Sequence, residues 1–274
     1  MNAQQMFDVD GQGAIVTGGA SGLGLAMAEV LAEHGASVTL LDMDEARLQA
    51  EVTRLVGQGF KVRGARLDVT DRAALDAAFD LAATWSGRLD IVFANAGIDP
   101  GPGFVNFADR TQRLPEHAIE NYEDARWDRV IDISLKAVLS SIQASARHMK
   151  PHGRGRIVVT TSTAAVRVAP GVGAAYMAAK AGAAHLVRNA ALELAHYGVR
   201  VNAIAPGPFI TNIGGGHIKN PAVQGAVAQQ IPLRRVAHPD EIKGLALLLA
   251  SDASSFITGQ QFVIDGGYTV GNVD

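Results

Sequence analysis

The chain has 274 residues, of which 48% are hydrophobic and 19% charged, and its formal net charge is −3. This composition is typical of a globular protein with a large core, and since no basic run occurs, nucleic acid is not an expected partner. The chain contains no cysteine, which excludes disulfides, thiolate catalysis and zinc–thiolate sites.

Targeting and metal signals are also missing from the sequence. The N-terminal residues MNAQQMFDVDGQG lack the basic and apolar regions of a signal peptide, and no apolar run has the length of a membrane span. A cytoplasmic location without membrane contact is therefore expected. No His-Glu-x-x-His pattern occurs, so we expect no catalytic metal.

Short β-rich runs alternate with longer helical patterns along the chain. Strands are predicted at residues 14–18, 37–42, 61–69, 89–97, 155–162, 199–207 and 260–265. Helices are predicted at residues 23–35, 44–59, 71–87, 127–149, 173–197 and 239–251. This alternation predicts an α/β fold: one doubly wound Rossmann-type domain over residues 1–274, with a seven-stranded parallel sheet and helices on both faces.

Two segments depart from the alternation. Residues 99–126 are irregular and rich in Pro, Gly and charge, and we expect this insertion to shape a substrate pocket. Residues 208–231 combine loop with short helix and contain NIGGGHIKN, which resembles a mobile lid. Ligands of doubly wound folds lie in the crevice at the carboxyl ends of the strands, so functional residues are expected there.

The first predicted strand runs directly into a glycine-rich loop, TGGASGLG at residues 17–24. Glycines allow a sharp turn and a close approach of the backbone to a pyrophosphate, which the N-terminus of the next helix would bind. The alternative is an ordinary tight turn, but the position between a first strand and a first helix favours a dinucleotide site. The candidate cofactor contacts here are Gly18, Ser21, Gly22, Leu23 and Gly24.

An acidic residue, Asp42, ends the second predicted strand, 18 residues after Gly24. Its carboxylate can accept both hydroxyls of an adenosine ribose and would repel a 2′-phosphate. No Arg or Lys adjoins it in LLDMDEA, which favours NAD over NADP, with Met43 beside it as a further contact. The alternative, that Asp42 caps the following helix, is less favoured because Asp44 is better placed for that role.

Two later strands end in polar or small residues on the same predicted edge. Asp68 and Val69 end the third strand, and Asp68 could accept a hydrogen bond from an adenine amino group. Asn95, Ala96 and Gly97 end the fourth. Each segment could also be a simple strand-end turn.

The stretch AAYMAAKAG, residues 174–182, places Tyr176 and Lys180 one helical turn apart on one face. Hydride transfer between an alcohol and a nicotinamide needs a group that takes the hydroxyl proton. A phenol is a weak base near neutrality, and a neighbouring ammonium lowers its pKa toward a useful range. Ser162, which closes the strand GRIVVTTS, could hold the substrate oxygen.

Together these motifs resemble the short-chain dehydrogenase/reductase family over nearly the whole chain, including PGPFIT at 206–211 and ITGQQFVIDGG at 257–267. The resemblance implies Tyr176 as general acid/base, Ser162 as the partner of the substrate oxygen, and Lys180 as a further contact to the nicotinamide ribose. It also implies a homotetramer that uses the helix at 173–197 and the last strand. The residues implied to wrap the nicotinamide end are Pro206, Gly207, Phe209 and Thr211.

Three features depart from the family pattern. Ser134 replaces the family's asparagine in VIDISLKAV, and since a serine lacks the amide's contacts, we expect a changed proton path with Ser134 as a catalytic candidate. The spacing from Ser162 to Tyr176 is one residue longer than the commonest one, so Thr163 is a second candidate. The 99–126 segment is also longer than usual.

The sequence therefore predicts an oxidoreductase that transfers a hydride between NAD and a secondary alcohol or ketone. Two alternatives remain: a non-catalytic NAD-binding sensor, and an epimerase or lyase that uses the same Tyr–Lys pair. The second alternative usually needs a larger C-terminal substrate domain than this chain has after its last strand. The sequence leaves the substrate open, from sugars and polyols to hydroxy acids, steroids and aromatic alcohols.

Overall fold

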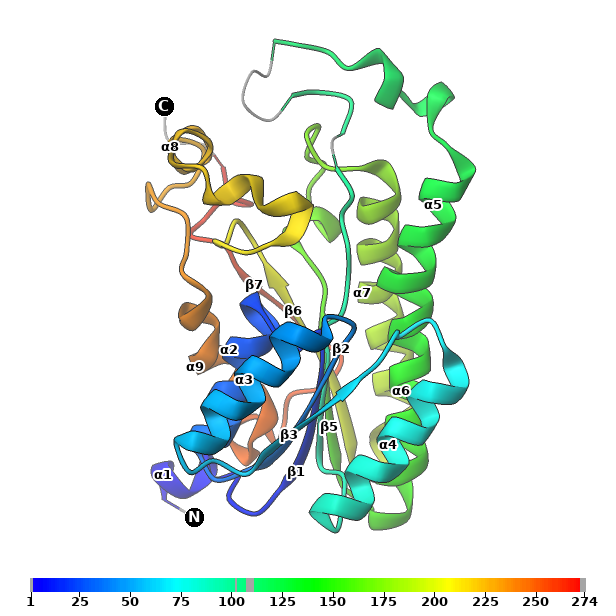
Figure 1. The fold of residues 1–274 in the computed structure, drawn as a ribbon, viewed down its shortest axis with the longest axis vertical. Coiled ribbons are helices and arrows are strands. Elements are labelled where there is room, and N and C mark those ends of the chain that lie inside the picture. Colours follow the sequence, from blue (N-terminus) through cyan, green and yellow to red (C-terminus); the bar gives the residue numbers. More distant parts are fainter. Residues whose placement is uncertain (1, 102, 107–110, 272–274) are drawn as a thin grey trace.

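The described strands form one seven-stranded parallel sheet in the order β3-β2-β1-β4-β5-β6-β7 (Figure 1). The computed structural model describes residues 2–101, 103–106 and 111–271. The strands are β1 Gly13–Thr17, β2 Ser37–Asp42, β3 Val62–Arg66, β4 Ile91–Ala94, β5 Gly155–Thr160, β6 Val199–Pro206 and β7 Gln261–Ile264. All seven predicted strands and the fold class are confirmed, but β3, β4 and β5 end two or three residues earlier than predicted.

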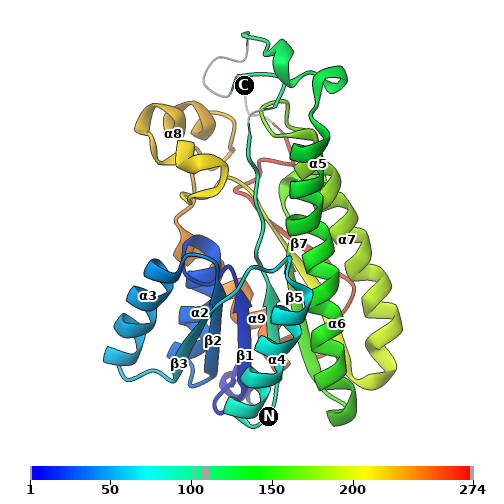
Figure 2. The same ribbon diagram turned by 45° about the vertical axis from the view of Figure 1, so that its right-hand side comes forward.

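Helices cover both faces of this sheet (Figure 2). They are α1 Ala3–Met6, α2 Gly22–Glu33, α3 Glu45–Gly57, α4 Arg72–Ser86, α5 Asp124–Ile131, α6 Ala137–Met149, α7 Ala174–Leu194, α8 Pro221–Ala228 and α9 Lys243–Ala250. One core cluster packs α2, α3 and α9 against the sheet, and a second packs α4, α6 and α7 against its other face. Because helices cover both faces, side chains on both sides of the strands are buried, and the strand sequences are nearly continuously apolar.

The helix predicted at residues 127–149 is interrupted in the structure. It begins three residues earlier, as α5, passes through a π-helical turn at Asp132–Lys136 and continues as α6. Such turns insert an extra residue into the helix and are frequent at functional sites. Here the turn carries Ser134, whose side chain is fully buried.

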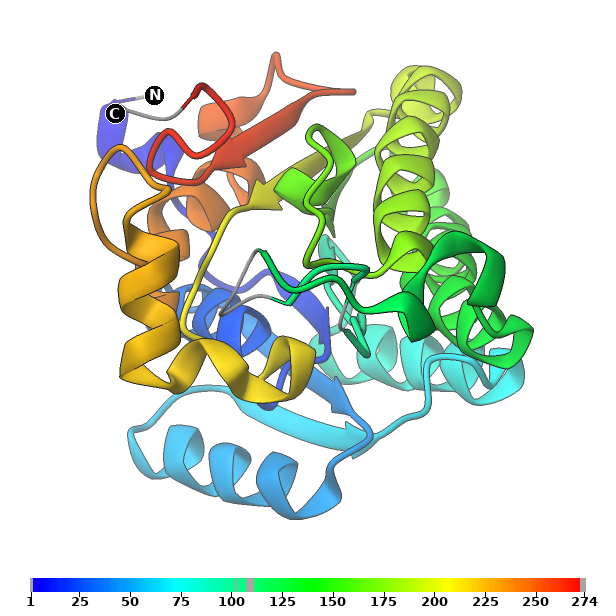
Figure 3. The ribbon, with the colours of Figure 1, turned by 90° about the horizontal axis from the view of Figure 1, so that it is seen from above.

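The functional edge of the sheet follows from the strand order. The order reverses between β1 and β4, so the connections leave in opposite directions and open a crevice at the carboxyl ends of the strands. Viewed from above, the segment after β4 and the segment containing α8 lie over this edge (Figure 3). Residues 102 and 107–110 of the predicted 99–126 insertion lie outside the described residues.

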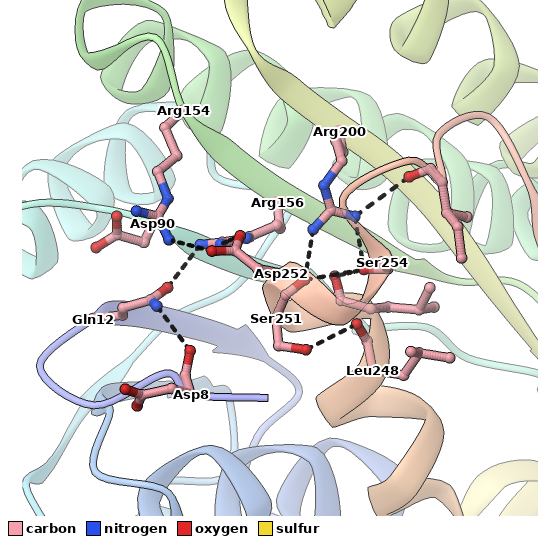
Figure 4. Close-up of polar contacts among 12 residues, drawn as sticks. Asp8, Gln12, Asp90, Arg154, Arg156, Arg200, Leu248, Ser251, Asp252 and Ser254 are labelled. Atoms are coloured by element: carbon pink, nitrogen blue, oxygen red, sulfur yellow. Dashed lines mark hydrogen bonds and ion pairs between the residues drawn. The ribbon is translucent and has the colours of Figure 1, made fainter. Parts of the chain in front are cut away.

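A polar network at the opposite end of the sheet ties β5 and β6 to the segment after α9 (Figure 4). The side chain of Arg156 is 2% exposed, ion-pairs with Asp252 and donates to Gln12 Oε1 at 2.7 Å. Its register neighbour Arg200 donates to Ser254 Oγ at 2.8 Å, and burial lowers the pKa of Arg200 to about 10. These arginines are bonded within the fold at the end away from the crevice.

Within the described ranges, none of the helices combines the length and apolarity needed to cross a bilayer.

Candidate active site

The glycine-rich loop forms a cradle between β1 and α2. Gly18 and Gly22 have φ of +63° and +55°, a region that favours glycine. A β-carbon added to Gly24 would lie 2.1 Å from the carbonyl oxygen of Gly18, so only glycine fits there. Ser21 is the N-cap of α2, yet its side chain makes no capping hydrogen bond. The Ser21 hydroxyl and the N–H groups of the first helical turn can therefore bind a pyrophosphate.

Asn95, directly after β4, holds this cradle in place through hydrogen bonds. Its Nδ2 donates to the carbonyl oxygens of Thr17 and Gly18 at 3.1 and 3.2 Å, and its Oδ1 accepts from Thr160 Oγ1 at 2.9 Å. The backbone N–H groups of Asn95 and Ala96 donate to Thr17 Oγ1 at 3.0 and 3.1 Å. Thr17 and Thr160 were not singled out from the sequence. Their only sequence signal is that each lies at the end of a strand on the crevice edge.

Asp42 lies at the end of β2 beside the cradle. Its Oδ2 accepts from the N–H of Ala20 and its Oδ1 from that of Asp44, both at 3.0 Å. Asp44, not Asp42, caps α3, as expected. Arg66 at the end of β3 is the register partner of Asp42 in the sheet, and its charge acts on the neighbouring Asp68. Met43 is 56% exposed next to it.

Asp68 lies in the loop after β3, outside the strand that was predicted to contain it. Its Oδ1 accepts from the N–H and the hydroxyl of Thr70 at 2.9 and 2.7 Å, and these bonds hold the pKa of Asp68 below its usual range. The side chain therefore stays an ionised, exposed acceptor. Val69 packs against the core on the α4 face, and Leu23 packs against the other core cluster.

The structure brings Tyr176, Ser162 and Lys180 together. Tyr176 is the third residue of α7 and is 7% exposed, and a hydrogen bond links its phenol to the Ser162 side chain. Lys180 is 1% exposed; its Nζ donates to the carbonyl oxygen of Thr160 at 2.7 Å and lies 5.5 Å from the centroid of the Tyr176 ring. Ser162, rather than its neighbour Thr163, makes the contact with the phenol despite the longer spacing.

The pKa shifts of Tyr176 and Lys180 contradict the expectation that Lys180 lowers the pKa of the phenol. Burial raises the pKa of Tyr176, the hydrogen bond from Ser162 opposes this, and the charge of Asp99 raises it further. Burial also lowers the pKa of Lys180 from 10.5 to about 8. The expected lowering of the Tyr176 pKa by Lys180 is therefore not achieved by the protein's own groups, because the desolvation of a buried phenolate outweighs it.

Ser134 makes two contacts that were not foreseen. Its Oγ accepts from the N–H of Ile98 at 3.1 Å and donates to the carbonyl oxygen of the same residue at 3.2 Å. A β-carbon added to Gly97 would lie 3.1 Å from Lys180 Nζ and 3.5 Å from Ser134 Oγ. The π-helical turn thus uses a short hydroxyl to fix the backbone beside the lysine.

The segment after β6 lies against the same crevice. Pro206 ends β6, and a β-carbon on Gly207 would lie 2.5 Å from the Asp265 side chain. Thr211 lies close to the cradle, since its Cγ2 would be 3.4 Å from a β-carbon on Gly22. Phe209 is 4% exposed and packs in the α2 core cluster, so its ring faces the core more than the crevice.

We predict that Ser134→Ala destabilises the fold, because the N–H and C=O groups of the partly buried Ile98 lose the partner that the buried Ser134 hydroxyl supplies. One such unsatisfied group costs about 1–3 kcal/mol. The free energy of unfolding in urea measures this. Ser141→Ala is the matched control: it is also a buried serine, but its Oγ bonds only the helical carbonyl of Ala137. An equal loss in both variants would contradict the role of Ser134.

The buried ammonium of Lys180 predicts a pH-dependent stability. Between about pH 8 and the ordinary value of 10.5, Lys180 is neutral in the folded state and protonated in the unfolded state. The unfolded state then binds more protons, so stability rises with pH by up to about 1.4 kcal/mol per pH unit. Urea unfolding of the wild type and Lys180→Met across this range should show that rise in the wild type alone. Lys136→Met, at a side chain 72% exposed, should keep it, and its loss there would count against this explanation.

Comparison with known proteins agrees with this geometry. A family model described as Enoyl-(Acyl carrier protein) reductase matches residues 18–269. Cis-4-hydroxycyclohexanecarboxylate dehydrogenase of Sinomonas cyclohexanicum is 39% identical over 257 residues, which cover 93% of this chain and 96% of that protein.

Two solved structures share the fold over nearly their whole length. A short-chain type dehydrogenase/reductase from Mycobacterium marinum has a TM-score of 0.87 and 32% identity, with 98% of this chain and 99% of that chain covered. A gluconate 5-dehydrogenase from Burkholderia cenocepacia J2315, in complex with NADP and tartrate, has a TM-score of 0.86 and 32% identity at the same coverage. With the cradle, the Ser162–Tyr176–Lys180 cluster and these full-length matches, the chain belongs to the short-chain dehydrogenase/reductase family of oxidoreductases.

Proposed function

We propose that this protein is an NAD-dependent dehydrogenase that oxidises a secondary alcohol to a ketone and catalyses the reverse reduction. The observation that carries the proposal is the contact of the Tyr176 phenol with Ser162, above the buried ammonium of Lys180. A phenol in that place can exchange a proton with a substrate hydroxyl that Ser162 orients.

Three residues of the chain have separate roles in alcohol oxidation. The phenolate of Tyr176 takes the hydroxyl proton as the carbinol C–H bond breaks and the carbonyl forms. Ser162 donates a hydrogen bond to the substrate oxygen, and Lys180 opposes the reprotonation of the phenol with its positive charge. Bound NAD supplies the hydride acceptor and, in its oxidised form, a positive ring. Such a ring charge would offset the desolvation that raises the pKa of Tyr176.

The cradle and Asp42 support a dinucleotide with an unmodified adenosine ribose. The uncapped Ser21 hydroxyl and the exclusion of any side chain at Gly24 suit a close pyrophosphate. The carboxylate of Asp42 favours ribose hydroxyls over a 2′-phosphate. Arg66 is the register partner of Asp42, and a relative forms a complex with NADP, so the assay below runs NAD and NADP in parallel.

The relatives support a substrate class for this proposal, and that class is tested first. Names such as hydroxycyclohexanecarboxylate dehydrogenase and gluconate 5-dehydrogenase support a cyclic or polyhydroxylated secondary alcohol. The pure protein would be mixed with NAD or NADP and a panel of such alcohols, and the reduced nicotinamide followed by absorbance. NAD binding without turnover across the panel would favour the sensor alternative.

Tyr176→Phe should lower kcat by about 10²- to 10⁴-fold, because it removes the proton acceptor and keeps the ring. NAD affinity, measured by fluorescence titration, should be unchanged. Tyr197→Phe is the control, since Tyr197 lies at the far end of α7 and should keep full turnover. Comparable activity of Tyr176→Phe and the wild type would refute the assigned role.

Asp42→Ala should weaken NAD binding about 10- to 100-fold through the loss of charged hydrogen bonds to the ribose. NADP binding should stay the same or tighten. The control is Asp44→Ala, which removes an equal charge two residues away and the N-cap of α3. It should lower stability by about 1 kcal/mol without changing the NAD/NADP ratio. Equal weakening of both cofactors by Asp42→Ala would argue against the ribose contact.

The homotetramer implied by the family stays a proposal, as does the cytoplasmic location. Leu192 on α7 is 83% exposed, Val263 on the edge strand β7 is 41% exposed, and Phe256 before that strand is fully exposed, which supports contacts through these elements. Light scattering of the pure protein would count the subunits.

A further inference from the structure

The segment after β4 reaches the helix that carries Tyr176 through one side chain, Asp99. Its Oδ1 accepts from the N–H of Gly101 at 3.0 Å, and its carboxylate also accepts from the N–H of Gly173. Gly173 is the N-cap of α7, three residues before Tyr176. A carboxylate at a helix N-terminus is favourable and satisfies one of its free N–H groups. Asp99 therefore fixes the first turn of α7.

Three polar groups converge on Gly173. A β-carbon added there would lie 3.3 Å from Asp99 Oδ1, 3.3 Å from Tyr122 Oη and 3.6 Å from Arg126 Nη2. Arg126 donates to the carbonyl oxygen of Gly101 at 2.6 Å and lies 4.9 Å from the centroid of the Tyr122 ring. The buried Tyr122 hydroxyl finds no hydrogen-bond partner among the residues that the structure describes. The cluster thus joins the segment after β4, α5 and the start of α7.

Few charges act on Tyr176 from the elements packed around it. These elements are the segment after β4, α5 with its π-helical turn, the turn after β5 and α7 itself. The charge of Asp99 raises the pKa of Tyr176. Burial raises the pKa of Asp99 itself, and its hydrogen bonds and the charge of Arg126 oppose this. Lys180 Nζ lies 5.5 Å from the centroid of the Tyr176 ring. His117 in the segment after β4 bonds Arg126 Nη1 through its Nδ1 at 3.0 Å. The other charged or titratable side chains that the structure describes on these elements are exposed or bonded elsewhere: Arg113, Glu116, Glu120, Glu123, Asp124, Asp128, Arg129, Asp132, Lys136, Arg167, His185, Arg188 and Glu193.

We propose that Asp99 is a positioning residue for the reaction: it holds the first turn of α7 and, with Arg126, sets the proton affinity of Tyr176. Asp99 and Lys180 then act on the phenol in opposite senses, and their balance fixes the pH at which Tyr176 changes from acid to base. The inference rests on the proposed function, because it assigns Asp99 to the acid/base group of that reaction. A merely structural role would tie the loop to the helix without affecting the titration of Tyr176.

The test is the titration of Tyr176 in the NAD-saturated protein. Tyrosine labelled with ¹³C at the ring carbon that bears the hydroxyl gives one NMR signal per Tyr, and Tyr176→Phe assigns the relevant one. Asp99→Asn keeps an oxygen acceptor but removes the charge, so the Tyr176 midpoint should fall by about one pH unit. The pH profile of kcat/KM for alcohol oxidation should move by the same amount.

Two further variants complete the test: one is a charge control and the other should shift the midpoint in the opposite direction. Asp124→Asn removes an equal charge from an exposed position at the start of α5 and should leave the midpoint in place. Arg126→Met should move it upward, opposite to Asp99→Asn, because the negative charge loses its counterion; this arm also serves if Asp99→Asn folds poorly. Equal titration of Tyr176 in the wild type, Asp99→Asn and Arg126→Met overturns the inference while turnover stays intact. Absent turnover with a shifted midpoint would instead count against the proposed reaction.

Discussion

The buried ammonium of Lys180 is the constraint on which the rest of the site depends. With its side chain 1% exposed, its Nζ needs an acceptor, and the carbonyl oxygen of Thr160 at the end of β5 supplies one at 2.7 Å. Thr160 in turn donates through Oγ1 to Asn95, and Asn95 donates to Gly18 in the cradle. A single chain of hydrogen bonds therefore links Lys180, next to Tyr176 and Ser162, to the glycine-rich loop after β1.

The backbone after β4 is held at three successive places around that ammonium. A β-carbon on Gly97 would lie 3.1 Å from Lys180 Nζ, a tight contact; Ser134 pairs with both backbone groups of Ile98, and Asp99 bonds the start of α7. Such anchoring is costly to build, because each of these groups is removed from water and must find its partner inside the protein. It gives a site whose geometry is set before a substrate arrives.

Charged residues of both signs lie at each end of the crevice. The charge of Asp99 raises the pKa of Tyr176, whose ring centroid lies 5.5 Å from the ammonium of Lys180, and Asp42 has Arg66 as its register partner in the sheet. A balance of this kind makes both the working pH and the cofactor preference sensitive to single substitutions. Relatives with other cofactors, such as the NADP-bound gluconate 5-dehydrogenase, fit this picture.

The sheet, the glycine-rich loop and the Tyr176–Lys180 pair could be predicted from the sequence alone. Their signals are local: apolar runs buried on both faces, glycines where a side chain cannot fit, and two side chains one turn apart. Other features could not be predicted from local sequence: Ser134 pairs with Ile98, Arg66 is the register partner of Asp42, the Phe209 ring packs into the core, and Asp99 reaches Gly173. These contacts join residues 24 to 74 positions apart, or depend on a π-helical turn, and packing between elements sets them. The same holds for the pKa of Tyr176, because desolvation depends on burial by the whole fold.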